Sequence, residues 1–230
     1  MKPQPPGVIY SVLATLLDYP DQHLLDALEE ARALLRDAPG LTRSARSGAE
    51  RFIDYCGERD LLTLQENYVA LFDRGRDTSL YLFEHVHGES RDRGQAMVDL
   101  LQMYEQHGLH LERAELPDYL PVFLEYLSLL PADEARSLLR ETGEILQAIA
   151  TQLAKRASHY SFIVGALLPL AGVGDGPTPV VANDDDALAP PDPAELRSLD
   201  AAYADAPVRF TGAPAPATEP ITFYNHRPAR

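Results

Sequence analysis

Apolar residues recur at spacings of three and four positions throughout residues 1–170, and no stretch of useful length alternates apolar with polar residues. This spacing places apolar side chains along one face of a helix, whereas a half-buried strand requires alternation. Helices of this kind bury their apolar faces against one another when short connections join them. The chain is therefore predicted to be all-α, with a single helical bundle domain.

Prolines, glycines and polar connections divide the apolar pattern into segments. Asp21 is suited to cap the second helix, Gly108 to end the fifth, and Pro117 to occupy the first position of the sixth. Residues 79–88 read as a loop that leads into the fifth helix. Helices are expected over approximately residues 7–18, 21–38, 42–57, 61–72, 89–107, 115–130 and 133–158, followed by an apolar segment at 160–171.

The composition changes at about Gly172. Ten of the nineteen prolines fall in the last sixty residues, together with the acidic run Asp184 to Asp186. Such a segment buries too little apolar surface to offset the entropy lost on ordering. The predicted division is a helical domain at 1–171 and an extended, mostly disordered tail at 172–230, in which 196–203 is a candidate short helix and 208–212 a candidate docking segment.

The formal net charge of −15 argues against a nucleic-acid partner, which requires clustered basic residues, and suits a basic partner instead. The single cysteine, Cys56, cannot form an intramolecular disulfide, which fits a reducing cytoplasm. No apolar run is long enough to span a bilayer, and the first residues lack the features of a secretory signal. We expect a cytoplasmic protein with no cofactor of its own and no direct membrane insertion.

The sequence contains only weak signals for a catalytic or metal-binding site. His85 and His87 are closely spaced, but His107 and His110 lie at the other end of the expected helix, about 30 Å away. A metal-dependent enzyme using Glu84, His85 and His87 remains an alternative, although no metal-binding motif of established spacing is present. Cys56 lies on an apolar face, where a buried thiol is inert.

The first turn of the expected fifth helix contains two arginines, Arg91 and Arg93. Cations at the positive end of a helix dipole are unfavourable by about 0.3–1 kcal/mol each. Residues that are retained despite such a local cost to stability are candidates for a functional role. Because acidic, aromatic and apolar residues surround these arginines, the stretch from Ser79 to Gly108 is interpreted as one wall of a peptide-binding groove.

Three segments, at 80–97, 99–109 and 115–128, together resemble the respiratory nitrate reductase delta subunit, with looser similarity over the first helices and residues 207–212. The wider group is the redox-enzyme maturation chaperones of molybdoenzymes, which are all-helical. Its aromatic-x-x-Leu-Phe motif corresponds to Tyr68, Leu71 and Phe72. Its second motif, an acidic residue followed by Pro, Asp and His, corresponds to Glu115, Pro117 and Asp118, with Tyr119 in place of the usual His.

The resemblance implies a chaperone for assembly of nitrate reductase, not an enzyme. It implies binding to the N-terminal, leader-like peptide of the catalytic (alpha) subunit, so that the apoenzyme stays competent for molybdenum cofactor insertion before membrane docking. Proteins of molybdenum cofactor biosynthesis are further expected partners. The expected client-binding residues are Tyr68, Leu71, Phe72, Leu82, Phe83, Glu84, His85, His87, Arg91, Arg93, Pro117, Asp118 and Tyr119.

Two other interpretations are compatible with the same resemblance. The client could be a sister molybdoenzyme, such as a selenate or chlorate reductase. The chain could also be a permanent structural subunit of a membrane oxidoreductase, in which case it would be retained in the purified, active complex.

Overall fold

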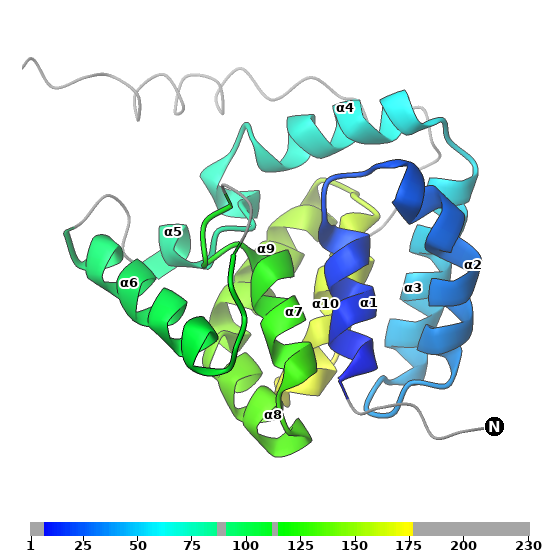
Figure 1. The fold of residues 1–230 in the computed structure, drawn as a ribbon. Coiled ribbons are helices and arrows are strands. Elements are labelled where there is room, and N and C mark those ends of the chain that lie inside the picture. Colours follow the sequence, from blue (N-terminus) through cyan, green and yellow to red (C-terminus); the bar gives the residue numbers. More distant parts are fainter. Residues whose placement is uncertain (1–6, 87–90, 112–114, 177–230) are drawn as a thin grey trace, which may run out of the picture. The chain divides into compact units, whose positions relative to one another are not determined.

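The computed structural model describes residues 7–86, 91–111 and 115–176 (Figure 1). These residues form helices and one isolated β-bridge, and none of them forms a strand, so the all-α prediction is confirmed for this part of the chain. The predicted division at residue 171 stays a prediction, because most of the tail lies outside the described residues. The helices are α1 (Val8–Leu17), α2 (Gln22–Arg36), α3 (Arg43–Gly57), α4 (Leu61–Phe72), the 3-10 helix η1 (Arg76–Thr78), α5 (Leu82–Val86), α6 (Arg91–Gln106), α7 (Leu120–Leu129), α8 (Ala132–Glu141), α9 (Gly143–Lys155) and α10 (Tyr160–Ala171).

The centre of the bundle is made by α1, which packs against α7 and α10, and by α10, which packs against α3 and α9 (Figure 1). Their apolar residues are distributed around most of the helix circumference, so each helix is buried on several sides. Gly7 precedes α1 where the two backbones meet, and a Cβ at this position would collide with the carbonyl oxygen of Ser128 in α7. Glycine at position 7 therefore allows the close approach of α1 to α7.

Side-chain caps begin three of the remaining helices. The carboxylates of Asp21 and Asp60 accept hydrogen bonds from the amides of Leu24 at 2.8 Å and Thr63 at 3.0 Å. Thr42 caps α3 in the same way. Each cap satisfies an amide that has no partner inside its helix. The predicted roles of Asp21 as a cap and of Gly108 as the glycine ending α6, with φ +80°, are confirmed.

The expected single helix over residues 133–158 is wrong. The chain forms α8 and α9, separated at Thr142, whose hydroxyl donates to the carbonyl of Leu139 at 2.8 Å. Gly143 is buried, and a Cβ there would lie 2.6 Å from a methyl carbon of Val173. The break escaped the sequence analysis because both helices are amphipathic and their apolar spacing shows no interruption.

Two boundaries near the expected groove also differ from the prediction. Helix α7 begins at Leu120, with Pro121 in its first turn, so Pro117 and Asp118 belong to a turn before the helix. The expected loop at 79–88 contains the short helix α5. Both differences follow from pairing between these two segments, which lie 35 or more residues apart and whose contact no local pattern could indicate.

Cys56 is completely buried, and burial raises the pKa of its thiol to about 12. The expectation of an inert thiol agrees with this environment. Among the described helices, none has both the length and the apolar character needed to cross a membrane.

Candidate functional site: a tyrosine pocket beside a buried aspartate

The two segments that precede α5 and α7 pair with each other. Tyr81 and Tyr119 form an antiparallel bridge. The amide of Leu82 donates to the carbonyl of Asp118 at 3.0 Å, and the amide of Leu120 donates to the carbonyl of Leu80 at 2.8 Å. This pairing satisfies backbone groups that would otherwise be buried without partners, and it fixes the position of both segments.

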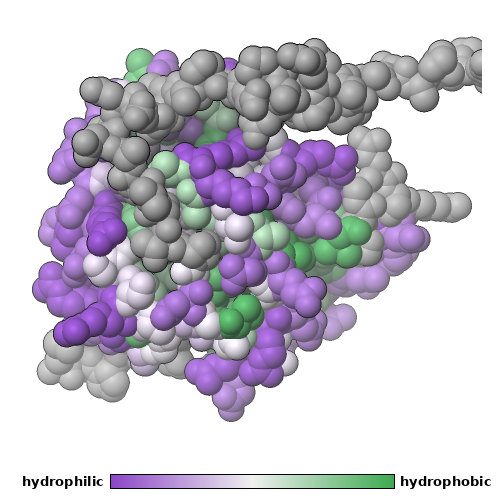
Figure 2. Space-filling model, turned by 180° about the vertical axis from the view of Figure 1, so that it is seen from behind, coloured by the Kyte–Doolittle hydropathy of each residue, from purple (hydrophilic) through white to green (hydrophobic). Residues whose placement is uncertain are grey.

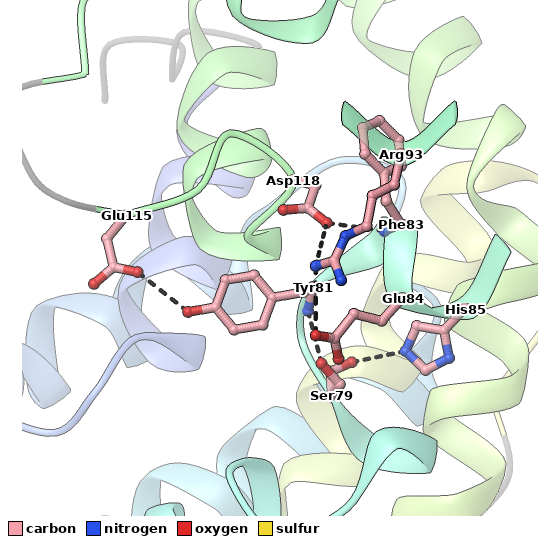
Figure 3. Close-up of polar contacts among 8 residues, drawn as sticks. All are labelled: Ser79, Tyr81, Phe83, Glu84, His85, Arg93, Glu115 and Asp118. Atoms are coloured by element: carbon pink, nitrogen blue, oxygen red, sulfur yellow. Dashed lines mark hydrogen bonds and ion pairs between the residues drawn. The ribbon is translucent and has the colours of Figure 1, made fainter. Parts of the chain in front are cut away.

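Asp118 is a carboxylate with no exposed surface (Figure 3). Its Oδ2 accepts a hydrogen bond from the amide of Phe83 at 3.0 Å and lies 3.9 Å from the guanidinium of Arg93. Its Oδ1 has no hydrogen-bond partner among the described residues. Burial raises the pKa of Asp118, and the Phe83 amide and the Arg93 guanidinium oppose this rise only in part.

Of the two arginines in the first turn of α6, Arg93 has acidic partners in the structure. Its guanidinium points inward, where it pairs with Asp118 and lies 3.4 Å from Glu84 of α5 (Figure 3). The electrostatic cost of a cation near the start of α6 is therefore offset by two carboxylates, one buried and one half-buried. The side chain of Arg91 lies outside the described residues.

The other end of α6 is attached through a tyrosine. Tyr104 is completely buried, its hydroxyl donates to the carbonyl of Pro117 at 2.8 Å, and its ring packs 4.6 Å from that of Tyr126. The hydroxyl of Tyr126 also lies 3.0 Å from Nδ1 of His107. The segment containing Pro117 and Asp118 therefore contacts α6 near both ends, through Tyr104 and Arg93.

A pocket of about 210 Å³ opens beside the paired segments, and we call it the tyrosine pocket. Four parts of the chain meet there: the end of α1, the end of α4, the segment before α5 and the segment before α7. Three of the lining residues are carboxylates and four are tyrosines. The pocket is lined by Asp18, Tyr19, Tyr68, Phe72, Asp73, Leu80, Tyr81, Glu115 and Tyr119.

Hydroxyl contacts connect the walls of the tyrosine pocket. The hydroxyls of Tyr68 and Tyr119 lie 2.6 Å apart, Tyr68 donates to the carbonyl of Leu17 at 3.0 Å, and Tyr119 lies 3.2 Å from Asp18. Tyr81 donates to Glu115 at 3.4 Å. Burial raises the pKa of Tyr68 and Tyr119 and, with the nearby Glu115 carboxylate, raises that of Tyr81 to about 12. All three hydroxyls are therefore neutral at pH 7.

An apolar surface adjoins the pocket through the segment from Tyr81 to Phe83. Hydrophobic residues form a patch among hydrophilic ones on the side of the molecule where α5 and α6 lie (Figure 2). On these two helices Val86 and Val98 are exposed by 57% and 47%. The half-buried apolar residues beside them are Phe83, Met97, Leu100, Leu101 and Met103. We call these seven residues the α5–α6 surface.

The structure brings together many of the predicted client-binding residues. Tyr68, Phe72 and Tyr119 line the tyrosine pocket, and Leu71 is half-buried in the same helix as the first two. Phe83, Glu84, His85 and Arg93 surround Asp118 or the loop before α5. Leu82, Pro117 and Asp118 are buried, so they are not exposed to a client at the surface. His87 lies outside the described residues.

Sequence reasoning did not include Asp18, Tyr19, Asp73 and Tyr81, which also line the pocket. A signal was present for the two aspartates. Each directly follows a helix, where the negative end of the dipole disfavours a carboxylate. The same argument that drew attention to Arg93 would have identified them. Tyr81 carried no such signal, because its role depends on pairing with Tyr119.

No group of three or more histidine, cysteine, aspartate and glutamate side chains is arranged to hold a metal ion among the described residues. His85 uses Nε2 for a 2.9 Å contact with the carbonyl of Ser79. His107 lies at the far end of α6 and contacts Tyr126. His85 and His107 therefore have structural partners in separate places.

The raised pKa of Asp118 predicts how stability depends on pH. The folded protein holds this proton more tightly than the unfolded chain does, so the contribution of protonated Asp118 is complete below about pH 4 and is lost as the pH rises through the raised value. The variant Asp118→Asn has no charge to lose. We expect its free energy of unfolding, relative to the wild type, to increase between about pH 4 and pH 8. Urea unfolding at several pH values checks this, and a constant or decreasing difference would contradict it.

The chain matches the family described as "Nitrate reductase delta subunit" over residues 38–162. It is 42% identical over 204 residues to the nitrate reductase molybdenum cofactor assembly chaperone NarJ of Escherichia coli, which covers 86% of this chain and 83% of the relative. It is 48% identical over 165 residues to the chaperone NarW of the same species, covering 71% of this chain and 68% of the relative.

A crystal structure described as a redox enzyme maturation protein from Archaeoglobus fulgidus has the same fold. Its TM-score is 0.51 at 20% identity, and the match covers 73% of this chain and 94% of that one. The named relatives are assembly chaperones, not catalytic enzymes, so the metal-dependent enzyme alternative is set aside. The chain belongs to the nitrate reductase delta subunit family.

Proposed function

We propose that this chaperone serves the assembly of respiratory nitrate reductase in the cytoplasm. It binds the N-terminal, leader-like segment of the catalytic subunit and holds the apoenzyme competent for molybdenum cofactor insertion before membrane docking. Contact with proteins of cofactor biosynthesis would occur in this bound state. The names of the relatives support the client, because NarJ and NarW are nitrate reductase chaperones.

One observation carries the proposal: an acidic, aromatic pocket and an apolar surface are joined by the short segment from Tyr81 to Phe83. An amphipathic peptide presents an apolar face and a polar face, so it can use both features at once. The apolar face would lie on the α5–α6 surface, and basic residues of the polar face would lie at the pocket. The net charge of −15 adds long-range attraction for a basic segment.

Calorimetry tests the proposal with a synthetic peptide that copies the N-terminal segment of a respiratory nitrate reductase catalytic subunit from the same source as this chain. We expect saturable binding to the full-length protein that weakens as salt rises, because screening reduces charge complementarity. A peptide of the same composition in scrambled order is the control. No detectable heat, or equal binding of both peptides, would contradict the proposal.

Phe83 on the α5–α6 surface offers a second test of the same contact. It is half-buried beside exposed Val86, so Phe83→Ala should weaken peptide binding while the bundle stays folded. Circular dichroism and the unfolding midpoint report folding separately from affinity. A variant that aggregates or unfolds would show that this side chain belongs to the core instead.

A further inference from the structure

A second pocket, of about 500 Å³, opens between α3 and α10, which pack against each other, and we call it the α3–α10 pocket. Arg43, Ser47 and Arg51 lie one turn apart on the exposed side of α3 and form one wall. Phe162 and Gly165 of α10 are buried and form the other. The guanidinium of Arg51 lies 5.6 Å from the centre of the Phe162 ring. The pocket therefore combines a cationic edge with an apolar floor.

Basic groups outnumber acidic ones at the α3–α10 pocket, although the chain as a whole has a net charge of −15. The one carboxylate that lines it, Asp175, accepts a hydrogen bond from the hydroxyl of Thr42 at 2.6 Å. Neither Arg43 nor Arg51 forms an ion pair with a carboxylate among the described residues. An acidic segment is therefore the occupant whose charge complements this pocket.

The chain itself returns to the α3–α10 pocket after α10 ends. Gly172 ends the helix with φ +77°, and the amide of Val173 donates to the carbonyl of Leu168 at 3.0 Å, so the chain reverses its direction. Gly176 then packs against Gly165 so closely that a Cβ at position 176 would lie 2.7 Å from the Gly165 Cα. The tail therefore leaves the described part of the chain at Gly176, which lines the pocket.

The tail contains an acidic segment at a suitable distance from this point. The acidic run 184–186 consists of three aspartates and lies outside the described residues. It begins eight positions after Gly176, and eight residues span at most about 26–29 Å. Arg43 and Arg51 are also eight positions apart, but in a helix this separates them by only about 12 Å along the axis. Both arginines are therefore within reach of the acidic run.

Attachment to the same chain lowers the affinity that docking requires. Individual ion pairs between exposed side chains are weak. A short linker, however, holds the acidic run near the pocket at an effective concentration in the millimolar range. A contact with a dissociation constant of about 1 mM would therefore be occupied in a large fraction of the molecules.

We propose that the α3–α10 pocket is a docking site for the tail of this same chain, in which the acidic run 184–186 pairs with Arg43 and Arg51. The docked tail neutralises the cationic edge and blocks the pocket from acidic segments of other proteins. The residues involved belong neither to the tyrosine pocket nor to the α5–α6 surface. The inference is therefore independent of the proposed function and can fail without it.

A spin label in the tail tests the proposal in the full-length protein. Cys56 is completely buried, so a cysteine introduced by Ala187→Cys, directly after the acidic run, can be labelled selectively with a nitroxide. The nitroxide broadens the NMR signals of nearby backbone amides. We expect it to broaden the amides of Ser44 and Ser47 in α3 several-fold more than those of Asp99 and Gln102 in α6. Equal broadening in the two helices would overturn the proposal.

Charge variants show whether the arginines hold the tail. Arg43→Gln combined with Arg51→Gln should abolish the preference for α3, and salt at about 1 M should do the same, because it screens charges beyond about 3 Å. The matched control is Arg74→Gln combined with Arg76→Gln, which removes two exposed arginines outside the pocket and should keep the preference. If the preference persists without Arg43 and Arg51, the proposal is wrong.

Two further measurements separate the remaining outcomes. Replacing the three aspartates of the acidic run with asparagine changes no residue of the bundle and should also abolish the preference, whereas its persistence would contradict the proposal. Spin-labelled protein is also mixed with isotope-labelled protein that has no nitroxide. We expect no preferred broadening of α3 in this mixture. Broadening there would mean that the tail of a second copy occupies the pocket, and docking within one chain would be overturned.

Discussion

Replacing Arg93 with alanine is expected to lower the free energy of unfolding by about 2–3 kcal/mol. Removing one partner of a fully buried ion pair costs about 3–5 kcal/mol, because the remaining charge is left in the interior without compensation. Asp118 has no exposed surface, whereas the side chain of Arg93 is 22% exposed, so we expect a smaller value than for a fully buried pair. Urea unfolding followed by circular dichroism measures the change.

Arg32 provides a matched control, because its side chain is 21% exposed and it also pairs with two carboxylates. Its partners Glu29 and Asp54 are 83% and 58% exposed, so Arg32→Ala should cost less than about 1 kcal/mol. The double variant Arg93→Ala with Asp118→Asn should recover most of the loss, because it leaves no buried charge. Equal costs for the two arginines, or no recovery in the double variant, would show that Asp118 does not depend on Arg93.

Replacing Tyr160 with alanine is expected to cost about 3–5 kcal/mol, the usual range for truncating a large buried aromatic residue. Its ring lies 4.8 Å from Phe52, 5.7 Å from Tyr68 and 5.0 Å from Phe72, so it connects α10 to α3 and α4. Because Tyr68 and Phe72 line the tyrosine pocket, the cavity would also loosen the pocket wall. Thermal unfolding measures the first effect, and peptide affinity measures the second.

The variant Tyr160→Phe separates the ring from its hydroxyl. The hydroxyl is buried and has no hydrogen-bond partner among the described residues. An unsatisfied polar group of this kind costs about 1–3 kcal/mol, so its removal should raise stability by about 1 kcal/mol. A loss of stability in Tyr160→Phe would show that the hydroxyl is satisfied in solution.

Most helices of the bundle could be predicted from the sequence because the spacing of apolar residues along the chain indicates where an amphipathic helix forms. The apolar pattern located α1 to α4, α6 and α10, and Asp21 and Gly108 marked helix ends by their own chemistry. The break between α8 and α9 left no mark on the apolar spacing. At the break, the hydroxyl of Thr142 bonds back to Leu139, and Gly143 packs closely against Val173, thirty residues further along the chain.

The candidate site was predictable only where a local rule was broken. Arg93 stood out because of its position in the helix dipole, and the structure supplies its partner in Asp118. The pairing of Tyr81 with Tyr119, which builds one wall of the pocket, joins residues far apart in the chain and leaves no local signal. The resemblance pointed to Tyr68, Phe72 and Tyr119, and in the structure all three line one pocket.

The most direct test of the chaperone role is the molybdenum content of the client. The catalytic subunit of a respiratory nitrate reductase from the same source is produced with and without this chain, purified, and analysed for molybdenum per subunit. The product is also searched for the chain itself. The chaperone account predicts near-stoichiometric molybdenum only when the chain is co-produced, and a mature enzyme from which the chain has departed. Full molybdenum occupancy without the chain, or its retention as a subunit of the active enzyme, would contradict the account.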